Sequence, residues 1–239
     1  AVGQPRLAHH AKSLNSDASE ALKLPGVVQI ITAKELKAAG GSNIMAEGQF
    51  HERTTVMVPS RPVICEDKIF RYGDVVALAV ADTKEHARAA AAKVKVEIEK
   101  LPEYTSYLDA VMPDAMRIHE DTPNIFSMQP VMKGVGLERA SKVADVIDQS
   151  ACSVEGSFYS SREPHLSVEG VTVQAYFDED DNLAIQCKSQ GVYSSLGRIG
   201  NSLGIPKSKI RIIMNPTGAS FGWATNAGDI CLAGADQPK

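Results

Sequence analysis

Two runs of apolar residues stand out in the first hundred positions of the chain. Residues 75–81 are a continuous apolar stretch, the pattern of a strand buried on both faces, and residues 27–31 are a shorter run rich in β-branched side chains. Ala and Val then repeat along one helical face over residues 84–94, and residues 94–99 alternate between apolar and charged positions. This succession of strand, helix and strand predicts a small α/β domain.

Helix signals lie on both sides of the shorter run. Residues 18–24 predict a short helix that stops at a Pro-Gly pair. Thr32 lies three residues before Glu35, which is the spacing of a capping box, so a second helix is expected to begin there and to end at a pair of glycines. The polar and irregular stretch 42–61 is predicted to be an exposed loop.

Strand patterns dominate the second half of the chain. Residues 153–159 and 171–176 alternate between apolar and polar side chains, and residues 183–187 form another strand-like run. The acidic turn 178–182 separates the last two, which predicts a hairpin. No long periodic run occurs between positions 104 and 123, so a domain boundary is expected there.

The chain closes with a helix pattern over residues 193–203, a strand pattern over residues 209–214 and the signal of a further helix near Asn226. The sequence shows no packing partner for the last strand and helix. The chain also begins without a methionine and stops at Lys239. We therefore expect part of a larger protein, whether a split subunit, a processed product or a truncated form.

Composition narrows the class of protein. Hydrophobic residues make up 44% and charged residues 23% of the 239 positions, as in ordinary globular proteins. The net charge is −4 and basic residues are interspersed with acidic ones, which argues against a nucleic-acid partner. The sequence contains no apolar stretch of about 18 residues that would predict a membrane span. The N-terminus lacks the pattern of a signal peptide, so a cytoplasmic location is expected.

Cysteine and histidine show no metal-ligand spacing. The cysteines lie far apart and are expected to be isolated buried thiols: Cys65, Cys152, Cys187 and Cys231. His9 and His10 are neighbours whose side chains would point to opposite faces of a strand, which disfavours a shared metal. His119 and His165 are interpreted as structural histidines, with proton transfer as the alternative for His165.

A glycine-rich loop follows the last strand pattern and reads Thr217-Gly218-Ala219-Ser220-Phe221-Gly222-Trp223. Its glycines let the backbone approach a bulky ligand, and free N–H groups there are suited to an anionic or oxo group, especially beside a helix start. Taken by itself, such a loop is more often an ordinary turn.

Together with segments upstream, this loop resembles the molybdenum-cofactor part of the xanthine oxidase family, most closely that of bacterial aldehyde oxidoreductases. The matching segments follow one another through nearly the whole chain: Asp17–Leu22 with Pro25-Gly26-Val27, Arg61–Asp74, Ala87–Val96, His119 with Thr122-Pro123-Asn124, Glu163-Pro164-His165 with Glu169, and Thr217–Trp223. The resemblance implies an α+β chain with an α/β hammerhead domain over residues 1–112. The first portion of a mixed α/β molybdenum-cofactor-binding domain is expected over residues 113–239.

The resemblance also implies a reaction and a site. Family members insert a water-derived oxygen into a C–H bond of an aldehyde or an N-heterocycle, and the electrons leave through [2Fe–2S] clusters. The expected cofactor is a molybdenum–pterin group in its cytosine dinucleotide form. Its expected contacts in the loop are Gly218, Ala219, Ser220, Phe221 and Gly222, with Phe221 and Gly222 nearest the metal. Ser189 and Gln190 are expected contacts in a second segment, where many members carry a glutamine near the metal.

Two departures from the family pattern bear on substrate and activity. Ala219 replaces a usual glycine, and Trp223-Ala224-Thr225 replaces the Tyr-Lys-Phe of aldehyde-oxidising relatives. Trp223 and Thr225 are expected to line the substrate funnel. These departures keep a second interpretation open, namely a structural or assembly module that keeps the fold without binding cofactor.

Other parts of the machinery are expected outside the chain. The general-base glutamate is one, so no catalytic residue and no metal ligand is expected within these 239 residues. The expected partners are the remaining molybdenum-domain segment or subunit and a [2Fe–2S] domain or subunit. An FAD subunit is a further candidate partner, and the full assembly is expected to dimerise.

Overall fold

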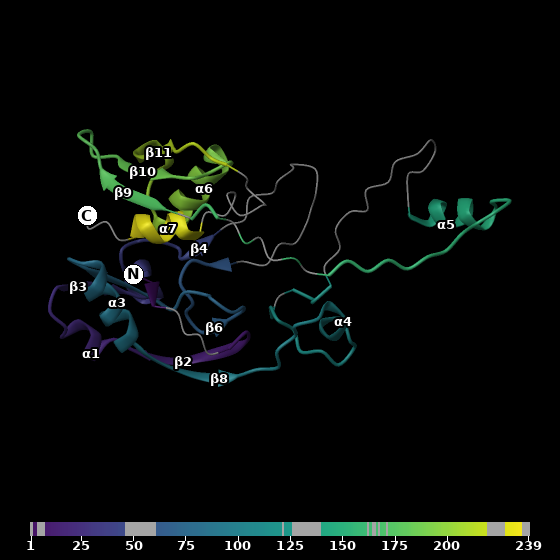
Figure 1. The fold of residues 1–239 in the computed structure, drawn as a ribbon, viewed down its shortest axis with the longest axis horizontal. Coiled ribbons are helices and arrows are strands. Elements are labelled where there is room, and N and C mark those ends of the chain that lie inside the picture. Colours follow the sequence, from purple (N-terminus) through teal and green to yellow (C-terminus); the bar gives the residue numbers. More distant parts are fainter. Residues whose placement is uncertain are drawn as a thin grey trace.

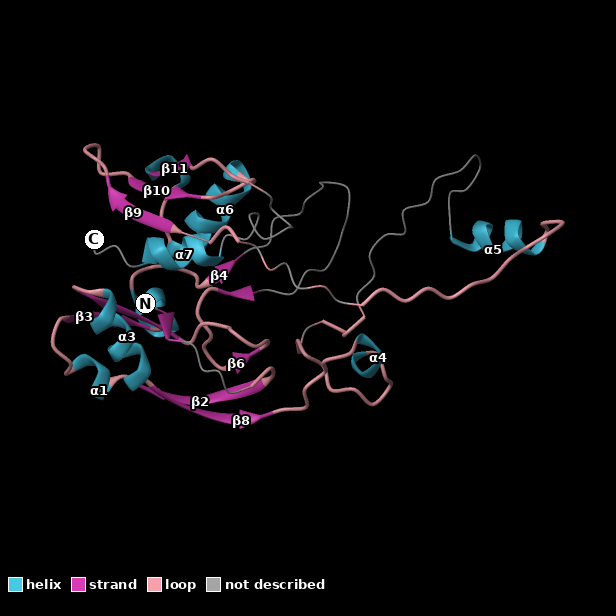
Figure 2. Cartoon of the chain, in the orientation of Figure 1, coloured by secondary structure: helices cyan, strands magenta, loops and turns pink. Residues whose placement is uncertain are grey.

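The computed structural model of the chain contains both helices and strands, as the α+β expectation requires (Figure 1). The described residues are 2–3, 8–45, 61–120, 122–125, 140–161, 163, 166, 168–170, 172–218 and 228–235. Within them the strands form three sheets of three strands and one of two. Figure 2 shows the strands in magenta and the helices in cyan.

The first sheet carries helices and has the antiparallel order β1-β7-β3. Its strands are β1 (Val2–Gly3), β3 (Val27–Ile31) and β7 (Ala77–Ala81). Helices α1 (Ser19–Leu22) and α3 (Lys84–Lys93) pack against this sheet and against each other. Buried alanines fill the contact, among them Ala21, Ala77 and Ala90, because small side chains let the helices approach the sheet closely. The helices and strands predicted here are confirmed.

The second sheet has the antiparallel order β6-β2-β8 and corrects the expected simple strand–helix–strand unit. Its strands are β2 (Ala11–Asp17), β6 (Lys68–Ile69) and β8 (Lys95–Lys100). The helix α3 joins β7 to β8 as predicted, but the two strands lie in different sheets. The central strand β2 carried no strand signal because most of its residues are polar.

The second helix, α2 (Ala33–Ala38), begins at the predicted capping box. The Lys34 N–H donates to the Thr32 hydroxyl at 3.2 Å, and the Thr32 N–H donates to the Glu35 carboxylate at 2.9 Å. These two bonds satisfy N–H groups that have no partner within the helix.

The predicted exposed loop over residues 42–61 is wrong in its first residues. Strand β4 (Ile44–Met45) pairs with β5 (Arg61–Pro62), and residues 46–60 lie outside the described residues. Asn43, immediately before β4, is buried: its carboxamide donates to the Ile64 carbonyl at 2.8 Å and accepts from the Ile64 N–H at 3.0 Å. A polar sequence can be buried when its side chains pair with backbone groups in this way.

The third sheet, with the order β11-β10-β9, belongs to the C-terminal part of the chain. Strands β9 (Val173–Phe177) and β10 (Leu183–Cys187) form the predicted hairpin. Helix α6 (Val192–Leu203) and the short 3-10 helix η1 (Lys207–Lys209) then lead to β11 (Ile210–Met214), which runs parallel to β10. Helix α7 (Gly228–Ala235) follows.

The two parts of the chain share one hydrophobic core. Helices α6 and α7 pack against each other and against the third sheet, on the side that faces β4 (Figure 1). Buried side chains from both parts meet there: Ile31, Leu36, Ile64, Leu183, Ile185, Ile199, Leu203, Ile230 and Leu232. The expectation that the last strand and helix lack packing partners is therefore wrong, because β10 pairs with β11 and α6 covers α7.

Hydrogen bonds fix the contact between the end of α6 and the segment before β4. The Ser202 hydroxyl donates to the Ile44 carbonyl at 2.9 Å, and the Asn43 N–H donates to the Ser202 carbonyl at 3.3 Å. Gly204 ends α6 in the left-handed region, with φ of 71°, and a Cβ atom there would lie 2.2 Å from the Gly40 carbonyl oxygen. Only glycine suits both the turn and the close approach.

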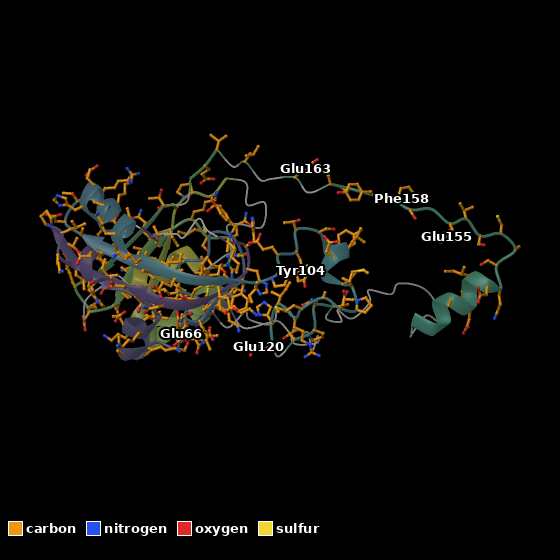
Figure 3. The ribbon with its side chains drawn as sticks, turned by 90° about the horizontal axis from the view of Figure 1, so that it is seen from below. Glu66, Tyr104, Glu120, Glu155, Phe158 and Glu163 are labelled. Carbon is orange, nitrogen blue, oxygen red and sulfur yellow. The ribbon has the colours of Figure 1, made fainter. Side chains whose placement is uncertain are left out.

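The segment between the two parts contains a stretch that projects away from the sheets (Figure 1). After α4 (Tyr107–Ala110) and the described residues up to 125, the chain reaches α5 (Ala140–Asp148) and then an extended, exposed run to residue 161. We call residues 140–161 the arm; Figures 1 and 3 show it projecting away from the rest of the molecule. The predicted strand over residues 153–159 is wrong, because no described strand pairs with this segment and a lone strand leaves its backbone groups unsatisfied.

Candidate functional site

Strands β10 and β11 end at the same edge of their sheet. Cys187, the last residue of β10, is level with Met214, the last residue of β11. The pairing continues one residue further, because the Asn215 N–H donates to the Cys187 carbonyl at 2.9 Å. We call residues 188–191 and 215–218, which leave the sheet side by side at this point, the β10–β11 edge. It brings together two segments that the sequence assigned to the cofactor.

Ser189 and Gln190 differ in what their side chains can reach. The buried Ser189 hydroxyl accepts a hydrogen bond from the Gly191 N–H at 3.2 Å and lies 3.5 Å from the Ser195 hydroxyl in α6. Gln190 is exposed. Ser189 therefore stabilises the turn into α6, and Gln190 is the more accessible of the two predicted contacts.

Glu169 reaches the β10–β11 edge from a third segment. Its Oε2 atom accepts a hydrogen bond from the Lys188 ammonium at 2.7 Å and another from the Gly218 N–H at 3.3 Å. The hydrogen bond and the charge of Lys188, together with the Gly218 N–H, hold the pKa of Glu169 below its usual value. The carboxylate is therefore ionised at neutral pH.

This role of Glu169 was not predicted from the sequence, where Glu169 is only part of a segment, after His165, that resembles the family. The contacts join residues 19 and 49 positions apart, and no short spacing marks such a contact. The only hint was that Lys188 directly follows a buried strand, where a charged side chain needs a partner.

Most of the predicted cofactor loop lies outside the described residues: Ala219, Ser220, Phe221, Gly222, Trp223 and Thr225. The structure fixes the two ends of this loop. Gly218 lies at the β10–β11 edge, and α7 begins at Gly228 and packs against α6, β9 and β10.

The chemistry of the β10–β11 edge suits an anionic, oxygen-rich ligand. The exposed Gln190 offers a carboxamide that can donate hydrogen bonds. The Lys188 ammonium and the Gly218 N–H already donate to one anionic group at this edge, the carboxylate of Glu169. The exposed donor at this edge therefore fits a molybdenum–pterin group, whose phosphate and oxo oxygens are hydrogen-bond acceptors.

The described histidines make structural contacts in or near the N-terminal part. His119 stacks on Phe70 with ring centroids 4.5 Å apart, and burial, followed by the nearby Lys68 and His10, lowers the pKa of His119. His10 is buried with its Nδ1 atom 2.8 Å from the Pro102 carbonyl oxygen. His119 thus has the structural contacts that the sequence predicted.

The neighbouring His9 is exposed, as the opposite-face prediction requires, although both residues lie just before β2 rather than in it. His165 lies outside the described residues. Across the described ranges, no cluster of three or more His, Cys, Asp or Glu side chains could hold a metal ion.

Three of the four thiols are buried, as predicted: Cys65, Cys187 and Cys231. Burial raises the pKa of Cys65 and that of Cys187, so both are neutral thiols. Cys152 is exposed, which corrects the prediction, because it lies in the arm where no other described element covers it. Within the described part of the chain, no helix has the length and apolar character needed to cross a membrane.

Two family profiles match this chain, one over each of its parts. Residues 7–102 match the profile of the "aldehyde oxidase and xanthine dehydrogenase, a/b hammerhead domain", and residues 118–235 match that of the "molybdopterin cofactor-binding domain". The aldehyde oxidoreductase of Megalodesulfovibrio gigas is 38% identical over 223 residues, which are 90% of this chain and 23% of that protein. The nicotinate dehydrogenase large molybdopterin subunit of Eubacterium barkeri is 27% identical over 213 residues, 89% of this chain and 45% of that subunit.

Solved structures show the same likeness. The aldehyde oxidoreductase from Desulfovibrio gigas superposes with a TM-score of 0.81 at 34% identity, over 98% of this chain and 25% of that chain. The Cu,Mo-CO dehydrogenase shares the fold, with a TM-score of 0.74 at 23% identity over 99% of this chain and 30% of that chain. The chain thus spans less than half the length of these relatives.

These matches define a chain with a hammerhead domain followed by the start of a molybdopterin-binding domain. It belongs to the xanthine oxidase family of molybdenum hydroxylases and resembles the bacterial aldehyde oxidoreductases within it. The resemblance inferred from the sequence is confirmed, and so is the α+β fold class.

Proposed function

We propose that this chain is part of a molybdenum hydroxylase that oxidises an aldehyde to the carboxylic acid, or hydroxylates an N-heterocycle. The observation that carries the proposal is the β10–β11 edge. There the two segments that resemble the family's cofactor contacts leave one sheet side by side, and the exposed Gln190 carboxamide suits an anionic ligand.

The proposed reaction needs a two-electron acceptor and a source of oxygen. An aldehyde and water give a carboxylic acid, two protons and two electrons. When bound, the molybdenum–pterin cofactor supplies this two-electron chemistry, and its cytosine dinucleotide form is the one we propose. The protein then has to bind, orient and shield the reactants.

The residues of this chain have holding and shielding roles in the proposal. Gln190 and the backbone N–H groups of residues 219–222 would hold anionic oxygens of the cofactor, and Phe221 and Gly222 would be the residues nearest the metal. Gly218 and Ser189 support these contacts from the start of each segment. Trp223 and Thr225 line the path of the substrate, where a small side chain at position 225 leaves more room than an aromatic one.

Other parts of the proposed enzyme lie outside this chain of 239 residues. We place the general-base glutamate in the remaining molybdenum-domain segment or subunit. The electrons leave through [2Fe–2S] clusters of another domain or subunit, with an FAD subunit as a further partner, and the full assembly is a dimer. Within this chain, the proposed domain boundary lies between residues 112 and 113.

The arm supports the proposal that a remaining segment packs on this chain. Large apolar side chains of the arm face solvent: Val146, Ile147, Val154, Phe158 and Tyr159. Phe158 is 99% exposed, and Figure 3 shows it on the extended run of the arm. An exposed apolar surface of this kind is typical of an interface. The match covers 23% of one relative and 45% of another, so a further segment of the molybdenum domain is the occupant we propose.

Molybdenum analysis of the purified full assembly tests the proposed function. We expect about one molybdenum and one pterin per copy of this chain, because the cofactor carries the redox chemistry. A stoichiometric assembly that stays free of molybdenum in molybdate-containing medium would instead favour the structural module, which the departures at Ala219 and Thr225 also allow.

A further inference from the structure

Glu169 contacts two segments that are far apart in sequence. Its Oε2 atom lies 2.7 Å from the Lys188 Nζ atom and 3.3 Å from the Gly218 nitrogen. Lys188 directly follows β10, and Gly218 lies four residues beyond the end of β11. The Oε2 atom of Glu169 therefore joins the segment that follows β10 to the segment that follows β11.

Glycine at position 218 leaves room for this contact. A Cβ atom at Gly218 would lie 2.9 Å from Glu169 Oε2, so the end of the Glu169 side chain would have to shift. The contact itself is made by a carboxylate at position 169 and donors at positions 188 and 218.

Strand pairing stabilises the residues before Gly218 but does not reach Gly218 itself. The Asn215 N–H donates to the Cys187 carbonyl, and the Gln186 carboxamide donates to the Asn215 side-chain oxygen at 2.8 Å. The Thr217 hydroxyl donates to the Asn215 carbonyl at 3.1 Å. Glu169 supplies the hydrogen bond to Gly218, the last described residue before the loop 219–227.

Glu169 also neutralises the charge of Lys188, whose side chain is largely buried. Only 8% of the Lys188 side chain is exposed, whereas 40% of the Glu169 side chain is. An ammonium group removed from water is costly unless a counter-charge accompanies it. A test of the contact must therefore separate the neutralisation of Lys188 from the hold on Gly218.

We propose that Glu169 is a positioning residue, which ties the start of the loop after β11 to the end of β10 and so fixes where that loop leaves the sheet. The proposal rests on the proposed function for the meaning of the loop. Gly218 then acts as an anchor whose N–H is taken by Glu169, so the cofactor contacts begin at residue 219. The lowered pKa of Glu169 agrees with this role, because the carboxylate stays ionised and a strong acceptor.

Two double variants of the full assembly separate the neutralisation of Lys188 from the hydrogen bond to Gly218. Glu169→Gln with Lys188→Met removes both charges but keeps a carbonyl oxygen that can accept from the Gly218 N–H. Glu169→Leu with Lys188→Met removes the charges and the acceptor. Amide hydrogen exchange of a peptide spanning residues 215–227 is measured in each, beside Glu163→Leu as a control at an exposed glutamate of the neighbouring segment (Figure 3).

We expect exchange in the Leu-containing double variant to be about three- to tenfold faster than in the Gln-containing one, as the loss of one hydrogen bond predicts. The control should match the wild type. Equal exchange in the two double variants would overturn the proposal.

Molybdenum content of the wild type in the same preparations distinguishes this proposal from the proposed function. A molybdenum-free assembly in which the acceptor still slows exchange would contradict the function and support the positioning role. A molybdenum-containing assembly with equal exchange in the two double variants would support the function and contradict the positioning role.

Discussion

At the scale of single residues, the Asn43 side chain bonds the backbone of another segment, as a neighbouring strand would do. Its carboxamide makes two hydrogen bonds to the backbone of Ile64, and its φ of 58° lies in the left-handed region, which asparagine tolerates better than most residues. We predict that Asn43→Ala lowers the free energy of unfolding by about 2 to 4 kcal/mol, because it leaves two buried backbone groups without partners.

Chemical denaturation of the purified protein measures this loss. Asn43→Gly is the matched variant, since it also removes both hydrogen bonds but relieves the backbone strain. It should be the less destabilised of the two by about 1 kcal/mol. An alanine variant as stable as the wild type would contradict the role of Asn43.

His119 gives the stability of the protein a pH dependence. Burial, then Lys68 and His10, lowers the pKa of His119 from its usual value of 6.5, so the unfolded chain takes up the proton first as the pH falls. The contribution of neutral His119 is therefore fully present above pH 6.5 and is lost progressively below it.

The variant His119→Phe keeps an aromatic ring to stack on Phe70 but cannot titrate. We predict that the free energy of unfolding of the wild type falls relative to this variant as the pH drops below 6.5. Denaturation at a series of pH values measures the difference. Parallel pH profiles for the two proteins would show that the protonation of His119 is not coupled to folding.

The sequence predicted some residues of the candidate site and missed others for physical reasons. Ser189, Gln190 and Gly218 were found through resemblance, and the structure brings them to one edge of a sheet. Local pattern could not identify Glu169, because its partners come from other segments. It also could not show that Ser189 is buried and Gln190 exposed, since that depends on how α6 packs over the turn.

At the scale of elements, the helices and the hairpin were predictable because their signals are local. Caps, glycine stops and periodicity identified α2, α3 and α6, each within one or two residues of its observed bounds. The strand β2 and the extended run in the arm were not predictable in the same way. Strands depend on distant partners, so a polar segment pairs in one case and an alternating segment stays unpaired in the other.

The end of α6 offers a test of how the two parts of the chain are joined. We predict that Gly204→Ala lowers the free energy of unfolding by about 2 to 4 kcal/mol, through left-handed strain and through a clash with the Gly40 carbonyl oxygen. Gly73→Ala is the control, because Gly73 also has a positive φ but a Cβ there would meet nothing within 4 Å. It should lose about 1 to 2 kcal/mol from strain alone. Equal losses in thermal or chemical denaturation would mean that the close approach to Gly40 does not matter.

At the scale of the whole molecule, the arm is expected to be an interface. We predict that the double variant Val154→Ser with Phe158→Ser leaves the stability of the isolated chain within about 0.5 kcal/mol of the wild type, because both side chains face solvent there. In the full-length protein the same change should speed proteolytic cleavage within residues 150–161 by about tenfold, since two apolar contacts are lost.

Glu155→Gln is the control for the arm, since it lies between the two changed residues and is exposed as well (Figure 3). It should be cleaved at the wild-type rate. If the serine variant of the full-length protein is also cleaved at the wild-type rate, then the remaining segment does not pack on these side chains.

In the proposed enzyme, the β10–β11 edge and the loop after Gly218 form one wall of a molybdenum-cofactor site. An experimental density map of the full assembly, prepared with molybdenum, is the decisive measurement. We predict metal density beside the loop 219–222, with Gln190 near the cofactor and Glu169 still bound to Lys188 and Gly218. Metal density away from this edge, or an assembly with none, would contradict it.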